Sequence, residues 1–313
     1  MDWVAGFWIP VIKAVVVVLA LLAGGAYMTW GERKLVSRFS VRYGPNMAGP
    51  FGSLQPLADA VKAIFKEEIV PNHVDRLVYV MAPGISFAAV LITFAVIPFG
   101  PEVDLFGKQV GLWIGDIDVG LLFLLAIAGL GSYGIVLGGW SSNNKYSLLG
   151  ALRAAAQMIS YELPMGLALL AVVLIVGSLS LREIVEFQGG WPHIALQPLG
   201  FLLFLVANVA ESNRSPFDLP EAENELVSGF MTEYGGIKFA LYFIAEYTAM
   251  VVNSAIVTTI FLGGWKWPEV ISALHPLAGV GLFLVKVLFV LFLYVWIRAS
   301  VPRVRYDKFM RFC

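Results

Sequence analysis

Long apolar runs alternate with shorter polar segments along the whole chain. Seven of these runs carry at most two charged residues each and cover residues 10–30, 77–99, 119–140, 154–179, 194–210, 237–262 and 277–298. Most reach the ~20 residues that a helix needs to cross a hydrocarbon core ~30 Å thick. The fifth is shorter, and we expect it to depend on its neighbours. The pattern predicts an all-α fold, a polytopic transmembrane helix bundle of seven spans that forms a single integral-membrane domain over residues 1–313.

The segment from Leu54 to Ile69 has a helical but not a membrane-spanning pattern. Apolar residues recur on one face of the predicted helix and charged residues lie opposite, namely Leu54, Leu57, Val61, Ile64 and Phe65 against Asp59, Lys62 and Lys66. The segment is too short and too polar to span a bilayer, which predicts an amphipathic interfacial helix. Two interpretations remain open: a surface helix packed on neighbouring helices, or a wall beside an opening for a lipophilic substrate.

Lysine and arginine are distributed unevenly between the predicted loops. The segments 31–76, 141–153 and 211–238 and the tail from residue 298 hold 16 of the 21 cations, whereas the alternate loops hold three, Lys108, Arg182 and Lys266. The positive-inside rule therefore predicts an N-terminus outside the membrane and cytoplasmic loops at 31–76, 141–153 and 211–236. With an odd number of spans, the C-terminus lies inside. The first apolar run lacks a small-residue cleavage site, so we interpret it as a span and not as a signal peptide.

Composition supports a membrane protein and excludes several kinds of site. Hydrophobic residues make up 59% of the chain, charged residues 14%, and mean hydropathy is +0.80, whereas soluble domains carry about 25% charged residues. The net charge of −1 gives no indication of a nucleic-acid partner. The one cysteine, Cys313, excludes an iron–sulfur cluster or a disulfide held by this chain alone. The histidines lack metal-ligand spacing and no dinucleotide- or phosphate-binding loop occurs, so we expect any redox cofactor to belong to a partner.

Several ionisable residues fall at membrane depth. Glu162 lies ~12 Å into the fourth span at ~1.5 Å per residue, and Glu211 closes the fifth. Glu246 and Lys286 lie near the middle of the sixth and seventh. Even on the lenient insertion scale such a charge costs about 3 kcal/mol, so it usually faces a bundle interior or water. One interpretation is an ion pair between Glu246 and Lys286, and the other is a chain of carboxylates that share and conduct protons.

The loop at 211–236 concentrates acid in an otherwise apolar chain. It carries one internal cation, Arg214, against six carboxylates, Glu211, Asp218, Glu221, Glu223, Glu225 and Glu233. Such a loop is usually solvated and mobile, and this one lacks the spacing of a calcium-binding loop. Its apolar residues favour a packed loop instead, namely Phe217, Leu219, Leu226, Val227 and Phe230. Pro216 and Pro220 disfavour a helix over 215–219, so a helix could begin at Pro220 or Glu221.

Four separate segments resemble the characteristic blocks of one protein family. They read GERKLVSRFSVRYGPNMAGPFGSLQPLADAVKAIFKE, WSSNNKYSLLGALRAAAQMISYELPMGLALL, ESNRSPFDLPEAENELVSGFMTEYGGIKFALYFIAEY and IRASVPRVRYDKFMRF, and they occur in the family's order. The family is the H-type membrane subunit of bacterial NADH–quinone oxidoreductase (respiratory complex I), equivalent to the mitochondrially encoded subunit 1. Its more distant relatives are membrane subunits of energy-converting hydrogenases and of ferredoxin- or deazaflavin-linked dehydrogenases.

The resemblance implies a function for each unusual feature. Members of the family anchor the peripheral electron-transfer arm and build much of the quinone chamber of a proton-translocating enzyme. The positions that match the quinone-binding wall, beside the first and sixth spans, are Arg33, Asp59, Lys62 and Phe65. The positions that match the carboxylates of the proton pathway are Glu162, Glu211, Glu221, Glu223 and Glu225, and Glu233 and Glu246 match as well.

The same resemblance implies which molecules this chain works with. Quinone is the expected substrate, and the chain is expected to bind no metal or redox cofactor, because the iron–sulfur clusters and the flavin are on partner subunits. The expected partners are the peripheral-arm iron–sulfur subunits, antiporter-like and small membrane subunits, and membrane lipid, without nucleic acid. The expected location is the bacterial plasma (inner) membrane.

The chain departs from the family pattern in two respects. Members usually have eight spans and continue past the RVRYD segment into a further one, which would place both termini outside, whereas this chain stops at Cys313. In addition, the third span (120–140) lacks the carboxylate that some relatives carry.

Three other functions remain compatible with the residues. The first is the membrane subunit of a ferredoxin- or deazaflavin-linked relative. The second is a stand-alone ion transporter, although the internal repeats typical of many transporters are missing. The third is a purely structural anchor, which leaves the carboxylates at membrane depth unexplained. Co-purification with an iron–sulfur peripheral arm would distinguish the oxidoreductase component from the transporter.

Overall fold

Six long helices dominate the described part of the chain. The computed structural model describes residues 2–105, 108–220, 223–268, 275–304 and 308 of the 313. Within them, the helices long and apolar enough to cross a membrane are α1 (Asp2–Phe39), α3 (Arg76–Phe94), α4 (Gly120–Ser141), α5 (Lys145–Val176), α10 (Gly236–Phe261) and α12 (Pro276–Ser300). The predicted helical membrane bundle is therefore confirmed.

The fifth predicted span differs from the others. Residues 194–210 fall on two helices, the single turn α7 (His193–Leu196) and the 14-residue α8 (Pro198–Glu211). Pro198 begins α8, and Gln197 before it has non-helical backbone angles (φ −134°, ψ 64°). Fourteen residues give ~21 Å, which is shorter than the hydrocarbon core. We expected this segment to depend on its neighbours, and the structure shows one such contact. The Gln197 side chain donates to the Ala171 carbonyl of α5 at 2.9 Å.

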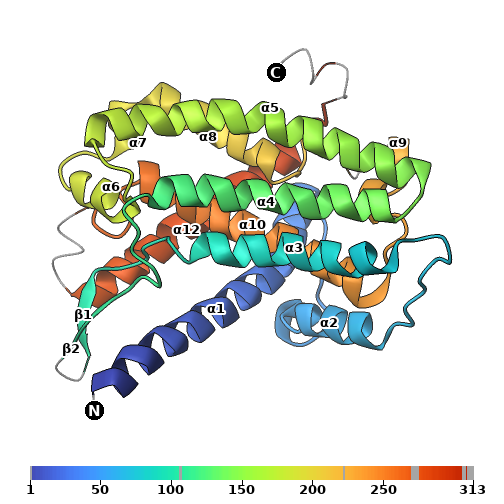
Figure 1. Ribbon diagram of the computed structural model, residues 1–313, viewed down its shortest axis with the longest axis horizontal. Coiled ribbons are helices and arrows are strands. Elements are labelled where there is room, and N and C mark those ends of the chain that lie inside the picture. The colour runs from blue at the N-terminus through green and yellow to red at the C-terminus, as the bar shows by residue number, and fades with distance from the viewer. Residues whose placement is uncertain (1, 106–107, 221–222, 269–274, 305–307, 309–313) are drawn as a thin grey trace.

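Helix α10 lies at the centre of the bundle. α3, α4 and α5 lie side by side, and α10 contacts α3, α1 and α12 (Figure 1). Three buried hydroxyl groups of this helix are satisfied within it, because Ser254, Thr258 and Thr259 each donate to a carbonyl four residues earlier. By contrast, α1 is the least buried of the six long helices, and its N-terminal half stands away from the others (Figure 1).

Close helix contacts depend on glycine at the crossing of α1 with α10. A Cβ atom built on Gly25 would lie 2.4 Å from the Thr248 hydroxyl oxygen, closer than real contacts allow. Any larger residue would push α1 away from the central helix. The close approach of α1 and α10 at this point therefore depends on glycine, which has no side chain.

Shorter elements connect the long helices. The structure contains an antiparallel hairpin of β1 (Glu102–Leu105) and β2 (Lys108–Gly111), the helix α6 (Leu181–Phe187), the single turn α9 (Glu223–Leu226), and the 3-10 turns η1 (Pro50–Gly52) and η2 (Gly229–Met231). The hairpin was not predicted from the sequence. The predicted amphipathic helix exists as α2 (Gln55–Phe65), but it ends four residues earlier than expected, because Lys66 has extended backbone angles (φ −70°, ψ 130°).

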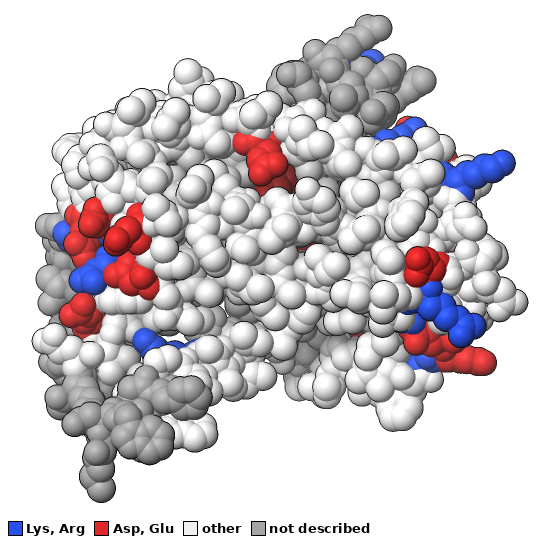
Figure 2. Space-filling model, viewed as in Figure 1, with Lys and Arg blue, Asp and Glu red and all other residues white. Residues whose placement is uncertain are grey.

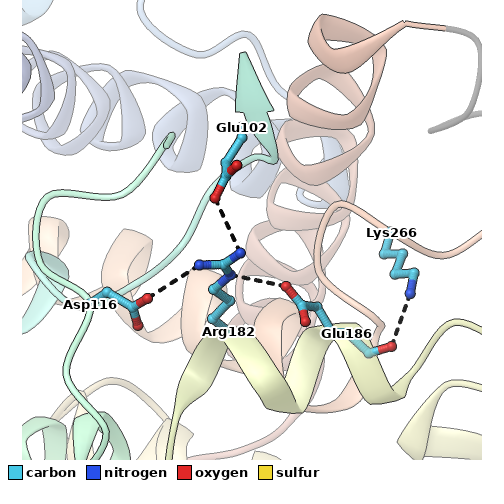
Figure 3. A network of polar contacts seen from close by, with 5 residues as sticks. All are labelled: Glu102, Asp116, Arg182, Glu186 and Lys266. Atoms are coloured by element: carbon cyan, nitrogen blue, oxygen red, sulfur yellow. Dashed lines mark hydrogen bonds and ion pairs between the residues drawn. The ribbon is translucent and has the colours of Figure 1, made fainter. Parts of the chain in front are cut away.

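Charged side chains gather at the two ends of the face shown in Figure 2, with one acidic patch over α4 and α5 between them. At the hairpin end, Arg182 of α6 contacts the carboxylates of Glu186 at 2.9 Å, Glu102 at 3.2 Å and Asp116 at 3.5 Å (Figure 3). The hydrogen bond to Glu186 is the main cause that raises the pKa of Arg182. Lys266 donates to the Glu186 carbonyl oxygen at 3.0 Å. This network ties the hairpin, α6 and the segment after α10 together.

Candidate functional site

A cavity lined by both polar and apolar side chains lies where the acidic loop meets the bundle. It has a volume of about 100 Å³ and lies between α3, α4, α5, α10 and the end of α8. Two carboxylates singled out from the sequence, Glu211 and Glu246, line it together with Ser86, Tyr242 and Asn253. The structure thus brings these two acids, 35 positions apart in the sequence, to one cavity.

Glu246 pairs with an arginine of the acidic loop. Arg214 Nη2 lies 3.3 Å from Glu246 Oε2, and the two side chains are only 8% and 10% exposed. The Arg214 guanidinium also lies over the Tyr247 ring, 4.1 Å from its centroid. A buried ion pair with a stacked guanidinium holds both groups in a defined geometry. Arg214 was visible in the sequence as the loop's one cation, but nothing there identified its partner.

The interpretation of Glu246 and Lys286 as an ion pair is wrong. Lys286 Nζ donates instead to three backbone carbonyls, those of Leu262 at 2.6 Å, Gly264 at 2.8 Å and Trp267 at 2.5 Å. These oxygens lie at and just beyond the C-terminal end of α10, where the helix dipole favours a cation. Lys286 therefore caps a helix and does not line the cavity.

The acidic loop is packed, as predicted, and most of the expected apolar residues anchor it. Leu219, Leu226 and Phe230 are buried, and Phe217 packs against the core. Val227 was wrongly counted among them: after α9 ends, its backbone enters the left-handed region (φ 66°) and its side chain is 60% exposed. The loop is also held by α5, because Gln157 Nε2 donates to the carbonyls of Ala210 at 2.6 Å and Phe217 at 2.8 Å.

Two other carboxylates of the loop, Glu225 and Glu233, have partners outside the cavity. Glu225 pairs with Arg153 of α5 at 2.5 Å, and Glu233 accepts a hydrogen bond from Asn144, the N-cap of α5, at 2.6 Å. Neither side chain lines the cavity. Glu221 lies outside the described residues, so a helix start at Pro220 or Glu221 stays a prediction, and the described part of α9 runs from Glu223 to Leu226.

Glu162 lies on the lateral surface of the bundle. Helix α5 begins at Lys145, earlier than the predicted 154, so Glu162 is near the middle of a 32-residue helix, deeper than the ~12 Å expected. Its side chain is exposed in this chain, and a Cβ atom built on Gly129 of α4 would lie 3.2 Å from its Oε1. Figure 2 shows an acidic patch over these two helices. A carboxylate at this place needs a polar partner or water.

The α2 segment carries the other residues singled out from the sequence. Arg33 Nη1 lies 3.1 Å from Asp59 Oδ2, and Gln55 Nε2 donates to the other Asp59 oxygen at 2.9 Å. Lys62 and Phe65 are exposed, and none of the α2 residues is buried. Because α2 contacts both α1 and α10, the interpretation of a surface helix packed on its neighbours is retained, and the opening for a lipophilic substrate stays a prediction. The apolar face of α2 is free for lipid, a partner or a lipophilic substrate.

An apolar groove of about 780 Å³ follows α1 on the side facing α12. It extends along α1 from Ile12 to Leu35, with α10 residues such as Val251 at its base, and Phe283 and Leu291 of α12 among its lining. Its walls are almost wholly apolar, with Lys13 and Tyr27 among the few polar side chains. Such a groove suits an elongated apolar molecule.

Comparison with known proteins agrees with this architecture. The sequence model of a family described as NADH dehydrogenase matches residues 12–313. The H subunit of NADH-quinone oxidoreductase from Deinococcus deserti is 51% identical over 316 residues, which cover 99% of this chain and 80% of that protein. The NADH-quinone oxidoreductase subunit 8 of Thermus thermophilus is 50% identical over 317 residues, which cover 100% of this chain and 84% of that protein. The corresponding H 2 subunit of Syntrophobacter fumaroxidans is 48% identical over 310 residues, which cover 99% and 92%. This chain therefore belongs to the NADH dehydrogenase family, as a membrane subunit of the H type found in bacterial NADH-quinone oxidoreductase.

Proposed function

We propose that this chain walls part of the quinone chamber of an NADH–quinone oxidoreductase and begins its proton pathway. The observation that carries the proposal is the cavity shared by Glu211 and Glu246, directly beneath the acidic loop. Carboxylates that line one buried cavity influence each other's proton affinity when they lie close together. Arg214 supplies the compensating charge beside Glu246.

Quinone reaches this region between α1 and α2. The exposed apolar face of α2, with Leu57, Ile64 and Phe65, meets the membrane interface, and the apolar groove along α1 accommodates a long tail. Arg33, Asp59 and Lys62 place polar groups beside the opening, where the quinone headgroup leaves the hydrocarbon. The acidic loop faces the peripheral arm, whose subunits hold the iron–sulfur clusters and the flavin.

Charge compensation links the two halves of the proposal. Electrons reach the quinone from partner subunits, and its reduction places negative charge near the acidic loop. Added negative charge raises the proton affinity of neighbouring carboxylates. Protons taken up at Glu211 and Glu246 then pass toward Glu162 on the lateral surface, where antiporter-like and small membrane subunits would receive them. Loops 31–76, 141–153 and 211–236 are cytoplasmic in this arrangement, and the N-terminus is outside.

The test replaces Glu211 with glutamine in the assembled complex, which removes its titration with little change in shape. We expect lower proton translocation per electron pair, or lower quinone-linked turnover, while assembly persists. Glu67→Gln is the matched control, because this exposed carboxylate lies outside the cavity. Translocation and turnover both equal to those of the unmodified complex would refute the proton pathway. Autonomous ion transport by the purified chain would favour the transporter instead.

The names of the relatives also bear on the electron donor of the complex. Those described above are named as NADH-quinone oxidoreductase subunits, which favours NADH over ferredoxin or a deazaflavin. Purification of the complex with its flavin-bearing subunits and measurement of quinone reduction with each donor would distinguish the three.

A further inference from the structure

Two consecutive residues at the end of α1 contact different elements. Glu32 is 3% exposed and forms an ion pair with Arg298 of α12. Arg33, the next residue, pairs with Asp59 of α2. Neighbours on an α-helix project ~100° apart, so one side chain faces the bundle while the other faces outward. The end of α1 is thus fastened on two sides.

The outward side contacts α2, which also contacts α10. No residue of α2 is buried. Its polar links are the contact of Asp59 with Arg33, the hydrogen bond from Trp30 Nε1 to the Phe51 carbonyl in the preceding turn at 3.3 Å, and the pair of Glu68 with Lys238 just after it at 3.0 Å. Two of these three links begin on α1. The third joins the segment after α2 to α10, which α2 also contacts, so the spacing between α1 and α2 depends on the position of the end of α1.

The inward side fixes that position. The N-terminal half of α1 is held by Lys13, which donates to the carbonyls of Gly111 and Trp113. The place of its C-terminal end is decided by the crossing at Gly25 and by contacts of the last turns. Among these contacts, Glu32 brings a negative charge into the interior, and its Oε2 atom is buried without a hydrogen-bond partner among the described residues. A buried carboxylate needs a compensating charge. Arg298 supplies it, so separating α1 from α12 would leave Glu32 uncompensated.

We propose that the ion pair of Glu32 with Arg298 positions the end of α1 and so sets the width of the opening between α1 and α2 through which the quinone tail passes. The inference rests on the proposed quinone access at α2. Glu32 and Arg298 do not touch the reacting headgroup in this arrangement. They act through Arg33, Trp30 and α2.

The experiment compares quinones with long and short tails in the assembled complex. Glu32→Gln keeps the shape of the side chain and removes its charge, so it weakens the hold on α12. We expect KM for a long-tailed quinone to rise about tenfold, the change produced by ~1.4 kcal/mol, while kcat with a tailless quinone stays unchanged. Glu67→Gln on the exposed segment after α2 is the control, with no change in either value.

A charge swap separates positioning from simple damage. Glu32→Arg combined with Arg298→Glu restores an ion pair in reversed order, and we expect it to return KM to within about threefold of the original value. Glu32→Asp, which retains the charge on a shorter side chain, gives an intermediate KM and serves if the swap fails to assemble. Equal loss of activity with both quinones in the assembled Glu32→Gln complex, or no change with either, would overturn the inference.

Phe65→Ala on α2 distinguishes this failure from failure of the quinone access itself. If Phe65→Ala leaves the KM for the long-tailed quinone unchanged, the opening is not at α2 and the proposed access is wrong. If Phe65→Ala raises that KM and Glu32→Gln does not, the access stands and only the positioning pair is refuted.

Discussion

Replacing Arg214 with glutamine should destabilise the chain more than replacing both members of its pair. In the single variant Arg214→Gln, the Glu246 carboxylate loses the cation 3.3 Å away while it stays buried. In the double variant with Glu246→Gln, no charge is left behind. Removing one member of a buried ion pair typically costs about 3–5 kcal/mol, whereas replacing the whole pair is often close to neutral.

The structure places the expected cost at the lower end of that range. Glu246 lines a cavity of about 100 Å³ together with polar side chains such as Asn253, and a cavity of this size has room for water, which partly solvates the carboxylate. The contact of the guanidinium with the Tyr247 ring at 4.1 Å disappears in both variants, so it cancels in the comparison. We therefore expect the single variant to lose about 3 kcal/mol and the double variant to recover most of it.

The assay follows both stability and function in the purified complex. Thermal or detergent-induced release of the chain from the complex gives the stability difference, and a double-mutant cycle with Glu246→Gln gives the coupling energy of the pair. Proton translocation in vesicles gives the functional result. If Glu246 takes part in proton uptake, the double variant regains stability without regaining translocation. A double variant as unstable as the sum of the two single ones would refute the reasoning, because it would show no coupling between the residues.

Two further predictions concern the frame around the cavity. Replacing Lys286 with methionine removes three hydrogen bonds to carbonyls at and beyond the end of α10. We expect the thermal midpoint to fall, because about 3 kcal/mol of stability is lost. Reduced proton translocation in a complex that still assembles would contradict the assignment of Lys286 as a structural cap. Replacing Gly150 with alanine places a Cβ 2.7 Å from the Phe230 backbone nitrogen, whereas the same change at Gly166 of the same helix meets no atom within 4 Å. The first should lose about 1–3 kcal/mol and the second should be neutral or slightly stabilising; equal midpoints would contradict this.

The long helices and the amphipathic α2 could be predicted because their signal is local. Hydropathy over ~20 residues and a period of 3.6 are properties of consecutive residues. The hairpin of β1 and β2 gave no such signal, since its strands are four residues each. Its place depends on contacts with distant elements, including the donation of Lys13 Nζ to the carbonyl of Gly111 at 3.0 Å. Contacts of this kind leave no periodic pattern.

The mistaken pair of Glu246 with Lys286 shows why depth is hard to read from one sequence. Each is the eleventh residue of its helix, in α10 and α12, so both lie ~15 Å from the helix start. In the predicted topology, however, the two helices run in opposite directions, and these distances are measured from opposite sides of the membrane. The two helices have 26 and 25 residues, so the eleventh residue lies short of the middle of each. The Cα atoms of Glu246 and Lys286 therefore lie on opposite sides of the mid-plane and differ in depth by several ångströms. The lysine side chain extends further along the same direction to reach the end of α10.

The acids of the loop are not equivalent once their partners are known. Within the loop, one cation faces six carboxylates, which suggested an excess of negative charge. This comparison left out the polar groups that other helices supply. Arg153 and Asn144 of α5 engage Glu225 and Glu233, so these two brace the loop against the bundle. Bracing of this kind favours a fixed position over a proton carrier, because each transfer would break the contact. Glu211 and Glu246 face a cavity instead, which makes these two the strongest candidates for proton uptake.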